Sequence, residues 1–347
     1  MGLLFLTNVY ARKMSFRKIR TILPVALAFI AVVACKKEEE STTYPSLEGR
    51  VSFDLEPYLG QNETVTMTAE GAEHPEGGEI TYSWSISPEI DADEDEDSDK
   101  DEGPVFTQNF GTEFRTYSVT CSASASGYNG ISTTRTTTIV KGGLDGTGSI
   151  TGIDISGTAG TVTDTEGNEY HYTAIGSLDW FIQNLASKES GQEGKEYGIP
   201  YDNADIMSDI FGRYYSYEDA LNACPEGWRL PSEEEWESCF GESGSGDLMV
   251  KSQFNGTEMW EFWPEVKITN STGFCAIPAG YANIESRSFS GLYGWAAFWV
   301  ASDSAASADM APVKYIREDN PEIQTFMADK ASFGASVRCV RDHQDTI

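Results

Sequence analysis

The segment 212–236, GRYYSYEDALNACPEGWRLPSEEEW, contains the starts of two short helices. Ser216 and Ser232 each precede a group of acidic residues, so each hydroxyl can accept a hydrogen bond from the first helical turn. Glu235 follows Ser232 by three residues and completes a capping box, and Gly241 can end the second helix. Helices this short are not stable alone. We therefore expect both to dock on the aromatic strands that follow them in the chain.

Several segments of the C-terminal half together form a recognisable motif pattern. In chain order they are VTDTEGNEYHYTAIGSLDWFIQNL (162–185), CPEGWRLPSEEEW (224–236), GFCAIPAGY (273–281), YGWAAFWVASD (293–303) and ASVRCVRD (335–342). This combination, spread over residues 160–342, resembles the Fibrobacter succinogenes major paralogous domain family. The resemblance implies an α+β fold similar to C-type lectins and formylglycine-generating enzymes, with two short helices and long loops. No common activity is established for the family, so the resemblance implies a fold and not a function.

Residues 1–34 have the features of a bacterial lipoprotein signal peptide. A basic stretch, residues 17–20, precedes an apolar run, 22–33, which is too short to span a membrane as a helix. The run ends in Val-Val-Ala-Cys, a lipobox, so we expect the Cys35 thiol to carry a diacylglyceryl group. Several acyl chains on one cysteine anchor a protein stably. A plain secretory signal with a chance cysteine is the alternative interpretation.

A charged run, KKEEE at 36–40, directly follows the predicted anchor. It resembles the surface-export signal of Bacteroidetes lipoproteins, which implies an outer-membrane lipoprotein exposed at the cell surface. Residues 35–44 are expected to form a short tether. The net charge of −31 disfavours nucleic-acid binding, which needs basic patches. The predicted partners are therefore the membrane, through the lipid, and a glycan or another envelope protein.

Residues 45–141 are predicted to form an all-β domain. Apolar and polar residues alternate in six stretches: 51–55, 65–68, 80–86, 105–110, 116–124 and 132–140. Short strands at this density are typical of an immunoglobulin-like sandwich. The segments ITYSWSI and YSVTCSASASGY resemble the polycystic-kidney-disease branch of that fold. Trp84 is expected to fill the core between the sheets, and Cys121 to be a buried free thiol.

The segment 89–102, EIDADEDEDSDKDE, carries aspartates at alternating positions. Carboxylates in such a run can ligate calcium. The segment lacks, however, the glycine at the sixth position of an EF-hand loop. A run of like charges favours the other interpretation, a solvated connection between two strands.

Residues 142–160 are rich in Gly, Thr and Ser, a composition typical of a flexible linker. They include one stretch, 150–155, with the alternation of a short strand. The C-terminal domain is then expected to span 161–342, and residues 343–347 to form a tail.

Four cysteines lie in the predicted C-terminal domain: Cys224, Cys239, Cys275 and Cys339. Disulfides persist outside the cytoplasm, and four cysteines allow three pairings. The resemblance to lectin-like domains favours Cys224–Cys339, which ties a helix end to the last strand and leaves Cys239–Cys275. A zinc site is the alternative, but the sequence has no CxxC pair and its three histidines are widely separated. We therefore predict no metal and no cofactor.

Catalysis has little support in the sequence. A serine or cysteine nucleophile needs a nearby base, and the histidine nearest to the motifs, His171, sits in a strand among tyrosines. Formylglycine-generating enzymes use two closely spaced cysteines near the C-terminal end, whereas Cys339 stands alone in ASVRCVRD. The calcium–sugar motif of C-type lectins is also missing, because the segment 318–322 has its residue types in the wrong order. The prediction is a protein that is not an enzyme.

Aromatic residues are concentrated in the C-terminal half. Trp260, Trp263, Tyr293 and Trp295 lie in or beside predicted loops and are the candidate ligand-binding residues. Sugars stack on aromatic faces while polar side chains hold their hydroxyls, so such loops suit a glycan. Packing of a loop-rich fold by the same residues is the alternative. The leading prediction is non-catalytic binding or adhesion, followed by a structural or assembly role among envelope proteins, with an enzyme of unknown type third.

Overall fold

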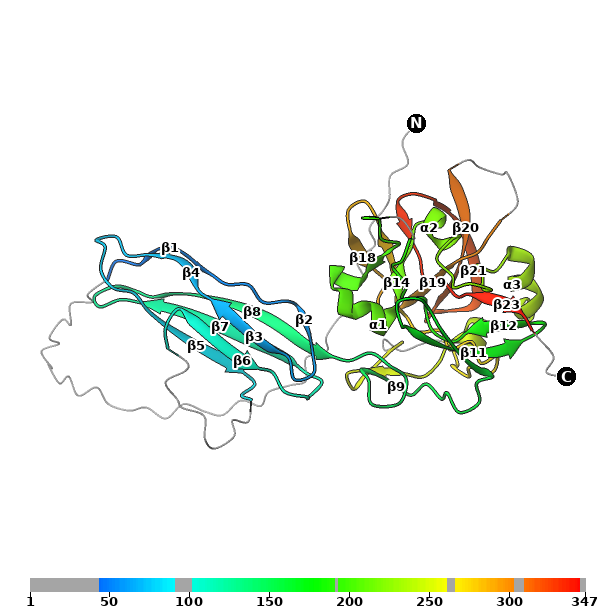
Figure 1. Ribbon diagram of the computed structural model, residues 1–347, viewed down its shortest axis with the longest axis horizontal. Coiled ribbons are helices and arrows are strands. Elements are labelled where there is room, and N and C mark those ends of the chain that lie inside the picture. The colour runs from blue at the N-terminus through cyan, green and yellow to red at the C-terminus, as the bar shows by residue number, and fades with distance from the viewer. Residues whose placement is uncertain (1–43, 91–101, 191–192, 261–265, 303–308, 344–347) are drawn as a thin grey trace, which may run out of the picture. The chain divides into compact units, whose positions relative to one another are not determined.

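The computed structural model of the protein describes residues 44–90, 102–190, 193–260, 266–302 and 309–343 (Figure 1). The predicted signal peptide, Cys35 and the charged run after it lie outside these ranges, as do Trp263 and most of the acidic segment 89–102. The described part of the chain is mostly β-sheet with few short helices, and 9% of it is helical. No described helix is long and apolar enough to cross a membrane.

Eight strands are described in the N-terminal β region, residues 44–140. They are β1 (Glu48–Ser52), β2 (Tyr58–Gly60), β3 (Thr64–Thr68), β4 (Glu70–Glu73), β5 (Thr81–Ser87), β6 (Val105–Asn109), β7 (Thr116–Ser124) and β8 (Ile131–Val140). One sheet has the order β2-β8-β7-β5, in which only β2 is parallel to its neighbour. Two antiparallel pairs, β1–β4 and β3–β6, complete the region. The six predicted stretches overlap six of these strands, and β2 and β4 are additional.

Trp84 lies in the core of the N-terminal β region, as predicted. Its ring stacks on Phe106 at a centroid distance of 5.4 Å and meets Phe53 edge-on at 5.0 Å. Trp84 Nε1 donates to Gly103 O at 2.9 Å, so the polar end of the buried ring is also satisfied. Cys121 is a fully buried free thiol in the same cluster, also as predicted.

Residues 142–160 do not form the flexible linker that their composition predicts. β9 (Ile150–Thr151) pairs with β15 (Gln253–Phe254), which in turn pairs with β16 (Thr257–Glu258), in a three-stranded antiparallel sheet. The apolar residues of the segment belong to or pack against one buried cluster: Leu144, Ile150, Ile153 and Ile155. Because burial of these side chains fixes the segment, we define the C-terminal region as residues 141–343.

A four-stranded antiparallel sheet brings the two ends of the C-terminal region together. Its order is β10 (Gly160–Thr163), β11 (Glu169–Ile175), β12 (Leu178–Phe181) and β23 (Val340–Asp342). In Figure 1, β23 is red and lies beside the green β12. Trp180 and Phe181 are neighbours on β12 but enter two different hydrophobic clusters. This is the alternation expected of a strand that is buried on both faces.

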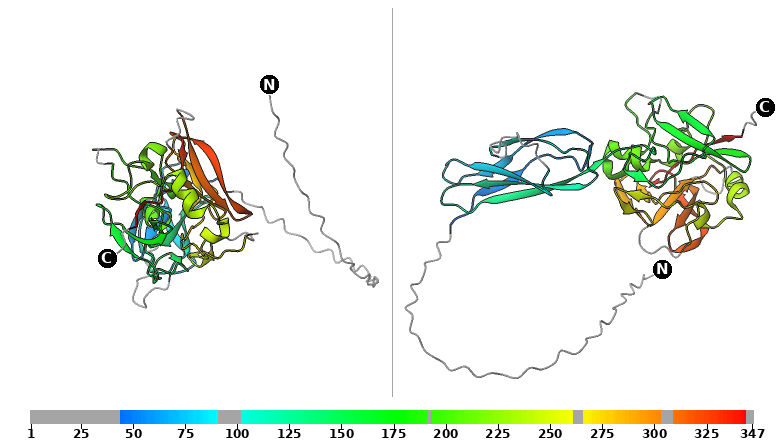
Figure 2. Two further views of the ribbon diagram at one scale, coloured as in Figure 1. Left: turned by 90° about the vertical axis from the view of Figure 1, so that its right-hand side faces the viewer. Right: turned by 90° about the horizontal axis from the view of Figure 1, so that it is seen from below.

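A second antiparallel sheet lies between the same two clusters. It consists of β19 (Trp295–Trp299), β20 (Met310–Arg317) and β21 (Asn320–Asp329), shown in orange to red in Figure 2. Trp299 packs in the cluster of Phe181, and Phe298 packs in the cluster of Trp180. The near-continuous apolar sequence of β19 reflects this burial on both faces.

Short elements connect the two sheets. They are β13 (Ile199–Pro200), η2 (Tyr201–Asn203), η3 (Asp205–Met207), α1 (Ser208–Phe211), β14 (Arg213–Tyr214), α2 (Tyr217–Ala220), α3 (Glu233–Phe240), α4 (Ser245–Leu248), β17 (Tyr281–Asn283), β18 (Ser288–Ser290) and β22 (Phe333–Gly334). β13 pairs with β14, and β17 lies between β18 and β22. Long connections with such short elements explain why local hydrophobic periodicity is weak in this half of the chain.

Both predicted helix starts are present. At α2, Ser216 Oγ accepts a hydrogen bond from Asp219 N at 3.2 Å. At α3, Ser232 Oγ accepts from Glu235 N at 3.2 Å, and a Glu235 carboxylate oxygen accepts from Ser232 N at 2.9 Å, which completes the capping box. Gly241 ends α3, but with φ of −60° and not in the left-handed conformation. α3 buries Trp236 beside Trp180, so packing holds this two-turn helix in place.

Candidate ligand-binding cavity

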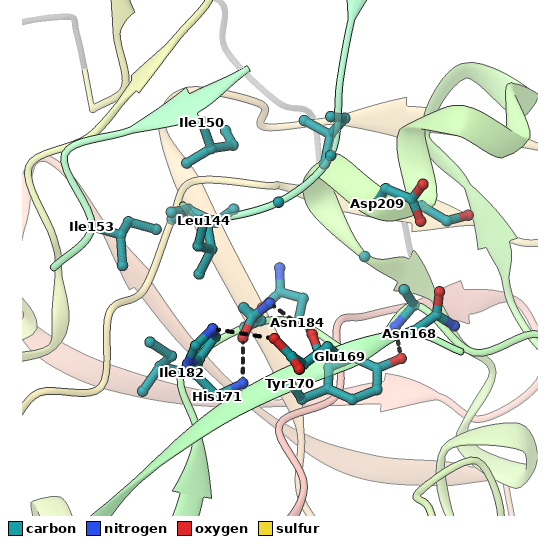
Figure 3. A pocket seen from close by; sticks show the side chains of 18 of the residues that line it. Leu144, Ile150, Ile153, Asn168, Glu169, Tyr170, His171, Ile182, Asn184 and Asp209 are labelled. Atoms are coloured by element: carbon teal, nitrogen blue, oxygen red, sulfur yellow. Dashed lines mark hydrogen bonds and ion pairs between the residues drawn. The ribbon is translucent and has the colours of Figure 1, made fainter. Parts of the chain in front are cut away.

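A cavity of about 370 Å³ lies between the segment 141–153 and the body of the C-terminal region (Figure 3). β11, the residues after β12 and α1 form the rest of its lining. The wall contributed by 141–153 exists because this segment is anchored through β9 to β15. The cavity therefore depends on a segment whose composition predicts a linker.

One part of the lining is aliphatic. It is formed by Leu144, Ile150, Ile153, Ile182, Ile210 and Ile277. Figure 3 shows Leu144, Ile150 and Ile153 on the side opposite His171 and Glu169. Apolar surface on this side favours the burial of a hydrocarbon portion of a ligand.

The opposite side is polar because of the alternation along β11. Tyr170 is buried in the core, where its hydroxyl donates to an Asp164 carboxylate oxygen at 2.8 Å. Its neighbours Glu169 and His171 therefore face the other way, toward the cavity. His171 Nε2 lies 3.8 Å from Glu169 Oε1, and 59% of the Glu169 side chain is exposed.

Asp209 from α1 is a further acidic group at the cavity (Figure 3). Its carboxyl retains contact with solvent, but surrounding protein removes part of its hydration, and this desolvation raises its pKa. The backbone at Gly142 packs closely against Asp209, and only a glycine permits this approach, because a Cβ atom at position 142 would lie 2.5 Å from Asp209 Cβ. Any side chain at this position would displace the wall of the cavity.

Arg338 lies behind the polar side and is only 1% exposed. Its Nε donates to Asn184 Oδ1 at 2.8 Å, and its Nη atoms donate to the carbonyl oxygens of Phe181, Phe274 and Cys275 at 2.8–3.1 Å. The guanidinium also lies 4.7 Å from the centroid of the Phe274 ring. Burial lowers the Arg338 pKa to about 9, because water no longer stabilises the charge. The residue therefore ties three chain segments together beneath the cavity.

The predicted disulfide Cys224–Cys339 is confirmed, with a Cα–Cα distance of 5.9 Å. The remaining pairing, Cys239–Cys275, is wrong: both residues are free thiols. The reason is that they belong to different clusters. Cys239 Sγ donates to Ile175 O at 3.3 Å, and Cys275 Sγ accepts from Asn270 Nδ2 at 3.2 Å beside the cavity.

Among the aromatic candidates, Trp260 is not a surface residue. It is 1% exposed, lies in the cluster of Trp180, and donates from Nε1 to Ala276 O at 3.3 Å. The interpretation of Trp260 as a ligand-stacking residue is therefore wrong, because both its ring and its N–H are used by the core. Trp263 lies outside the described residues.

Tyr293 and Trp295 are half-buried. Trp295 stacks on Tyr315 at a centroid distance of 5.3 Å, and the Arg317 guanidinium lies 4.6 Å from its centroid. Tyr293 packs against the cluster that contains Ile150. Because Trp260 is buried, the three described candidates do not form one exposed aromatic surface.

The three histidines lie apart and each has a neighbour. His74 contacts the ring of Tyr128 at 4.5 Å, His171 lies near Glu169, and His343 Nδ1 lies 2.6 Å from Asp179 Oδ1. Within the described ranges, no group of three or more His, Cys, Asp or Glu side chains is arranged to hold a metal ion. The acidic segment 91–101 lies outside those ranges.

The fold and cavity define a class of β-rich domain with few helices, closed by a disulfide that joins the connection between α2 and α3 to the residue before β23. Residues 173–341 match the Fibrobacter succinogenes major domain family, and this part of the chain belongs to that family. No curated protein and no solved structure matches the chain.

The cavity residues Asp209, Glu169 and Ile153 were not predicted as site residues. The available signal was the spacing of Leu144, Ile150, Ile153 and Ile155 in an otherwise polar segment. Four aliphatic residues in such a composition indicate burial, whereas a free linker would keep only small and polar side chains. Which surface buries them depends on the pairing of β9 with β15, about a hundred residues later in the chain, and this pairing has no local signature.

Proposed function

We propose that the protein is a lipid-anchored component of the bacterial outer membrane that binds a ligand without catalysis. Acylation at Cys35 anchors it, and the charged run after Cys35 directs it to the cell surface. The N-terminal β region is an immunoglobulin-like sandwich that serves as a spacer. The C-terminal region is a lectin-like domain that carries the binding site.

The observation that carries this proposal is the cavity of about 370 Å³ with one aliphatic and one polar side. Its volume lies within the range of roughly 300–1,000 Å³ that is usual for small-ligand sites. Such sites combine an apolar lining with a few polar groups that orient the ligand. Asp209, Glu169 and His171 fill the second role here.

The chemistry of the thiols favours binding over catalysis. Burial raises the pKa of Cys121 to about 11, and desolvation also raises the pKa of Cys239 and of Cys275. A nucleophilic cysteine needs a lowered pKa, because the thiolate is the reactive form. Cys275, the thiol that lines the cavity, is thus in its unreactive form at neutral pH.

The ligand is either a glycan or another molecule of the cell surface. Tyr293 and Trp295 remain candidates for stacking a sugar ring outside the cavity. Since the ring of Trp295 is already in contact with Tyr315 and Arg317, we place the principal site in the cavity instead.

The test is capture of glycans and envelope extracts by the full chain, compared with two variants of one segment. Ile153→Trp inserts an indole into the cavity, whereas Ile155→Trp places it in the same segment at a position that does not line the cavity. Both sites are half-buried, so both variants are expected to fold. Loss of capture with Ile153→Trp alone supports the proposal. Capture that survives Ile153→Trp but is lost with Trp295→Ala would contradict it.

The same experiment separates binding from assembly. Specific capture of one envelope protein, through a surface that neither substitution affects, would identify the protein as a structural or assembly component.

A further inference from the structure

Two amide side chains of the cavity, those of Asn184 and Gln183, already have hydrogen-bond partners. Asn184 Nδ2 donates to Phe211 O at 2.8 Å, and Asn184 Oδ1 accepts from Arg338. Gln183 Oε1 accepts from His171 N at 2.7 Å, and Gln183 Nε2 donates to Glu169 O at 3.2 Å. These side chains hold the walls in place and are not available to a ligand.

The two cationic side chains at the cavity, Lys141 and Arg338, are also occupied. Lys141 Nζ donates to Thr147 Oγ1 at 2.6 Å, and its charge is shared with the Asp145 carboxylate, whose pKa is lowered by hydrogen bonds from Thr147 and by the Lys141 ammonium. Four donor groups of Arg338 are used by the amide of Asn184 and by three backbone carbonyls, and the residue is almost fully buried. An anionic ligand therefore finds little unused positive charge in the lining.

The unused groups are carboxylate acceptors. Among the residues that the structure describes, the Asp209 carboxylate has no hydrogen-bond or ion-pair partner, and the only contact of the Glu169 carboxylate is His171 at 3.8 Å. Asp209 projects from α1, and Glu169 projects from β11 (Figure 3). Both side chains line the cavity, but they come from different elements.

This combination suits one kind of ligand. Carboxylates accept hydrogen bonds only, so their best partner is a group that only donates, and an ammonium is such a group. A sugar hydroxyl both donates and accepts hydrogen bonds, and its acceptor lone pairs would find no donor among these carboxylates. The net charge of −31 also concentrates cations near the protein.

We propose that the cavity binds a primary ammonium on an aliphatic stem, with the ammonium attracted by the two carboxylates of the lining, Asp209 and Glu169, and the stem along Leu144, Ile150 and Ile153. This inference rests on the proposed function and specifies the ligand class of the same cavity. A lysine side chain of a protein and a free alkylamine share this chemistry.

The test is isothermal titration calorimetry of the full chain with 1-aminohexane, 1-hexanol and hexanoate as probes. Binding of 1-aminohexane at least tenfold tighter than 1-hexanol is expected, with no detectable binding of hexanoate. Asp209→Asn and Glu169→Gln should each weaken 1-aminohexane at least fivefold, whereas Glu242→Gln, on an exposed residue away from the cavity, should not. A peptide containing one internal lysine, compared with 1-aminohexane, distinguishes the two sources of the amine.

The outcomes separate the ligand class from the site. If 1-hexanol binds as tightly as 1-aminohexane and Ile153→Trp abolishes both, the cavity is correct and the ammonium inference is overturned. If 1-aminohexane binds equally to wild type, Asp209→Asn and Ile153→Trp, both the inference and the proposed site fail. Near-ultraviolet circular dichroism of each variant verifies that lost binding does not reflect lost folding.

Discussion

Gly142 and Asp209 approach so closely that a Cβ atom on Gly142 would lie 2.5 Å from the Cβ atom of Asp209. Contacts this short do not occur between real Cβ atoms, so the residue at 142 must be glycine for the wall of the cavity to stay in place. Burial by the surrounding protein desolvates the Asp209 carboxyl and raises its pKa. No described residue pairs with this partly desolvated carboxyl, so its charge does not stabilise the fold, and an unpaired carboxyl with a perturbed pKa is typical of a functional site.

The first prediction follows from the raised pKa of Asp209. Because desolvation makes ionisation cost more in the folded chain than in the unfolded chain, the carboxylate destabilises the fold above its folded-state pKa. Asp209→Asn should therefore melt at a slightly higher temperature than wild type at pH 7. At pH 3 the two proteins should melt at the same temperature, because the Asp209 carboxyl is then neutral in both the folded and the unfolded wild-type chain. The gain is small because the carboxyl keeps contact with solvent.

Thermal unfolding at the two pH values measures this difference, with Glu242→Gln as the surface control. A variant that is less stable than wild type at pH 7 would show that Asp209 has a structural partner.

The second prediction concerns Arg338. Arg338→Leu removes the donors for four buried acceptors, and each unsatisfied acceptor costs about 1–3 kcal/mol. The free energy of unfolding should fall by about 3 kcal/mol or more, even though a buried charge is also removed. Arg287→Leu is the matched control, since Arg287 is exposed and contacts Asn203 at the surface. Urea unfolding that gives equal midpoints for the two variants would contradict the role assigned to Arg338.

The third prediction concerns the cysteines. Cys224 and Cys339 are 115 residues apart, so their link restricts a long loop of the unfolded chain. Replacement of both by serine should lower stability by about 4–5 kcal/mol through chain entropy alone. Peptide mapping without reduction should recover this link, and Cys121, Cys239 and Cys275 as free thiols. Recovery of a Cys239–Cys275 link would contradict the structure.

The fourth prediction concerns the anchor, which rests on the sequence alone. Cells fed labelled palmitate should incorporate label into the wild-type protein and not into Cys35→Ala, because the thiol is the acylation site. If the variant takes up as much label as wild type, or if wild type takes up none, Cys35 is not the acylation site.

Local signals were sufficient for several elements of the fold. The caps of α2 and α3 are visible in the sequence because their partners are three residues apart. Six of the eight strands of the N-terminal β region are visible because apolar and polar residues alternate along them, as they do in β7, whose buried residues occupy every second position. The burial of Trp84 is predicted by its place in an alternating strand. The Cys224–Cys339 link is predicted by the resemblance to lectin-like domains.

The site was less accessible to sequence reasoning. Trp260 lies next to polar residues in the chain, yet tertiary packing buries its ring beside residues far away in the sequence. Glycine and threonine around Ile150 suggest mobility, but pairing with β15 and burial of four aliphatic side chains hold the segment. In both cases long-range contacts override the local composition.

The most direct test of the central claim, that a ligand occupies the cavity, is photo-crosslinking in the native cell envelope. The photoreactive residue photo-leucine, a diazirine analogue close to isoleucine in size that leaves the cavity open, is placed at position 153 in one strain, at position 155 in a second and at position 295 in a third. The account predicts a crosslinked adduct from position 153 and none from positions 155 and 295, because only residue 153 lines the cavity. An adduct from position 295 with none from position 153 would contradict this account and would favour a binding site at the half-buried aromatic residues.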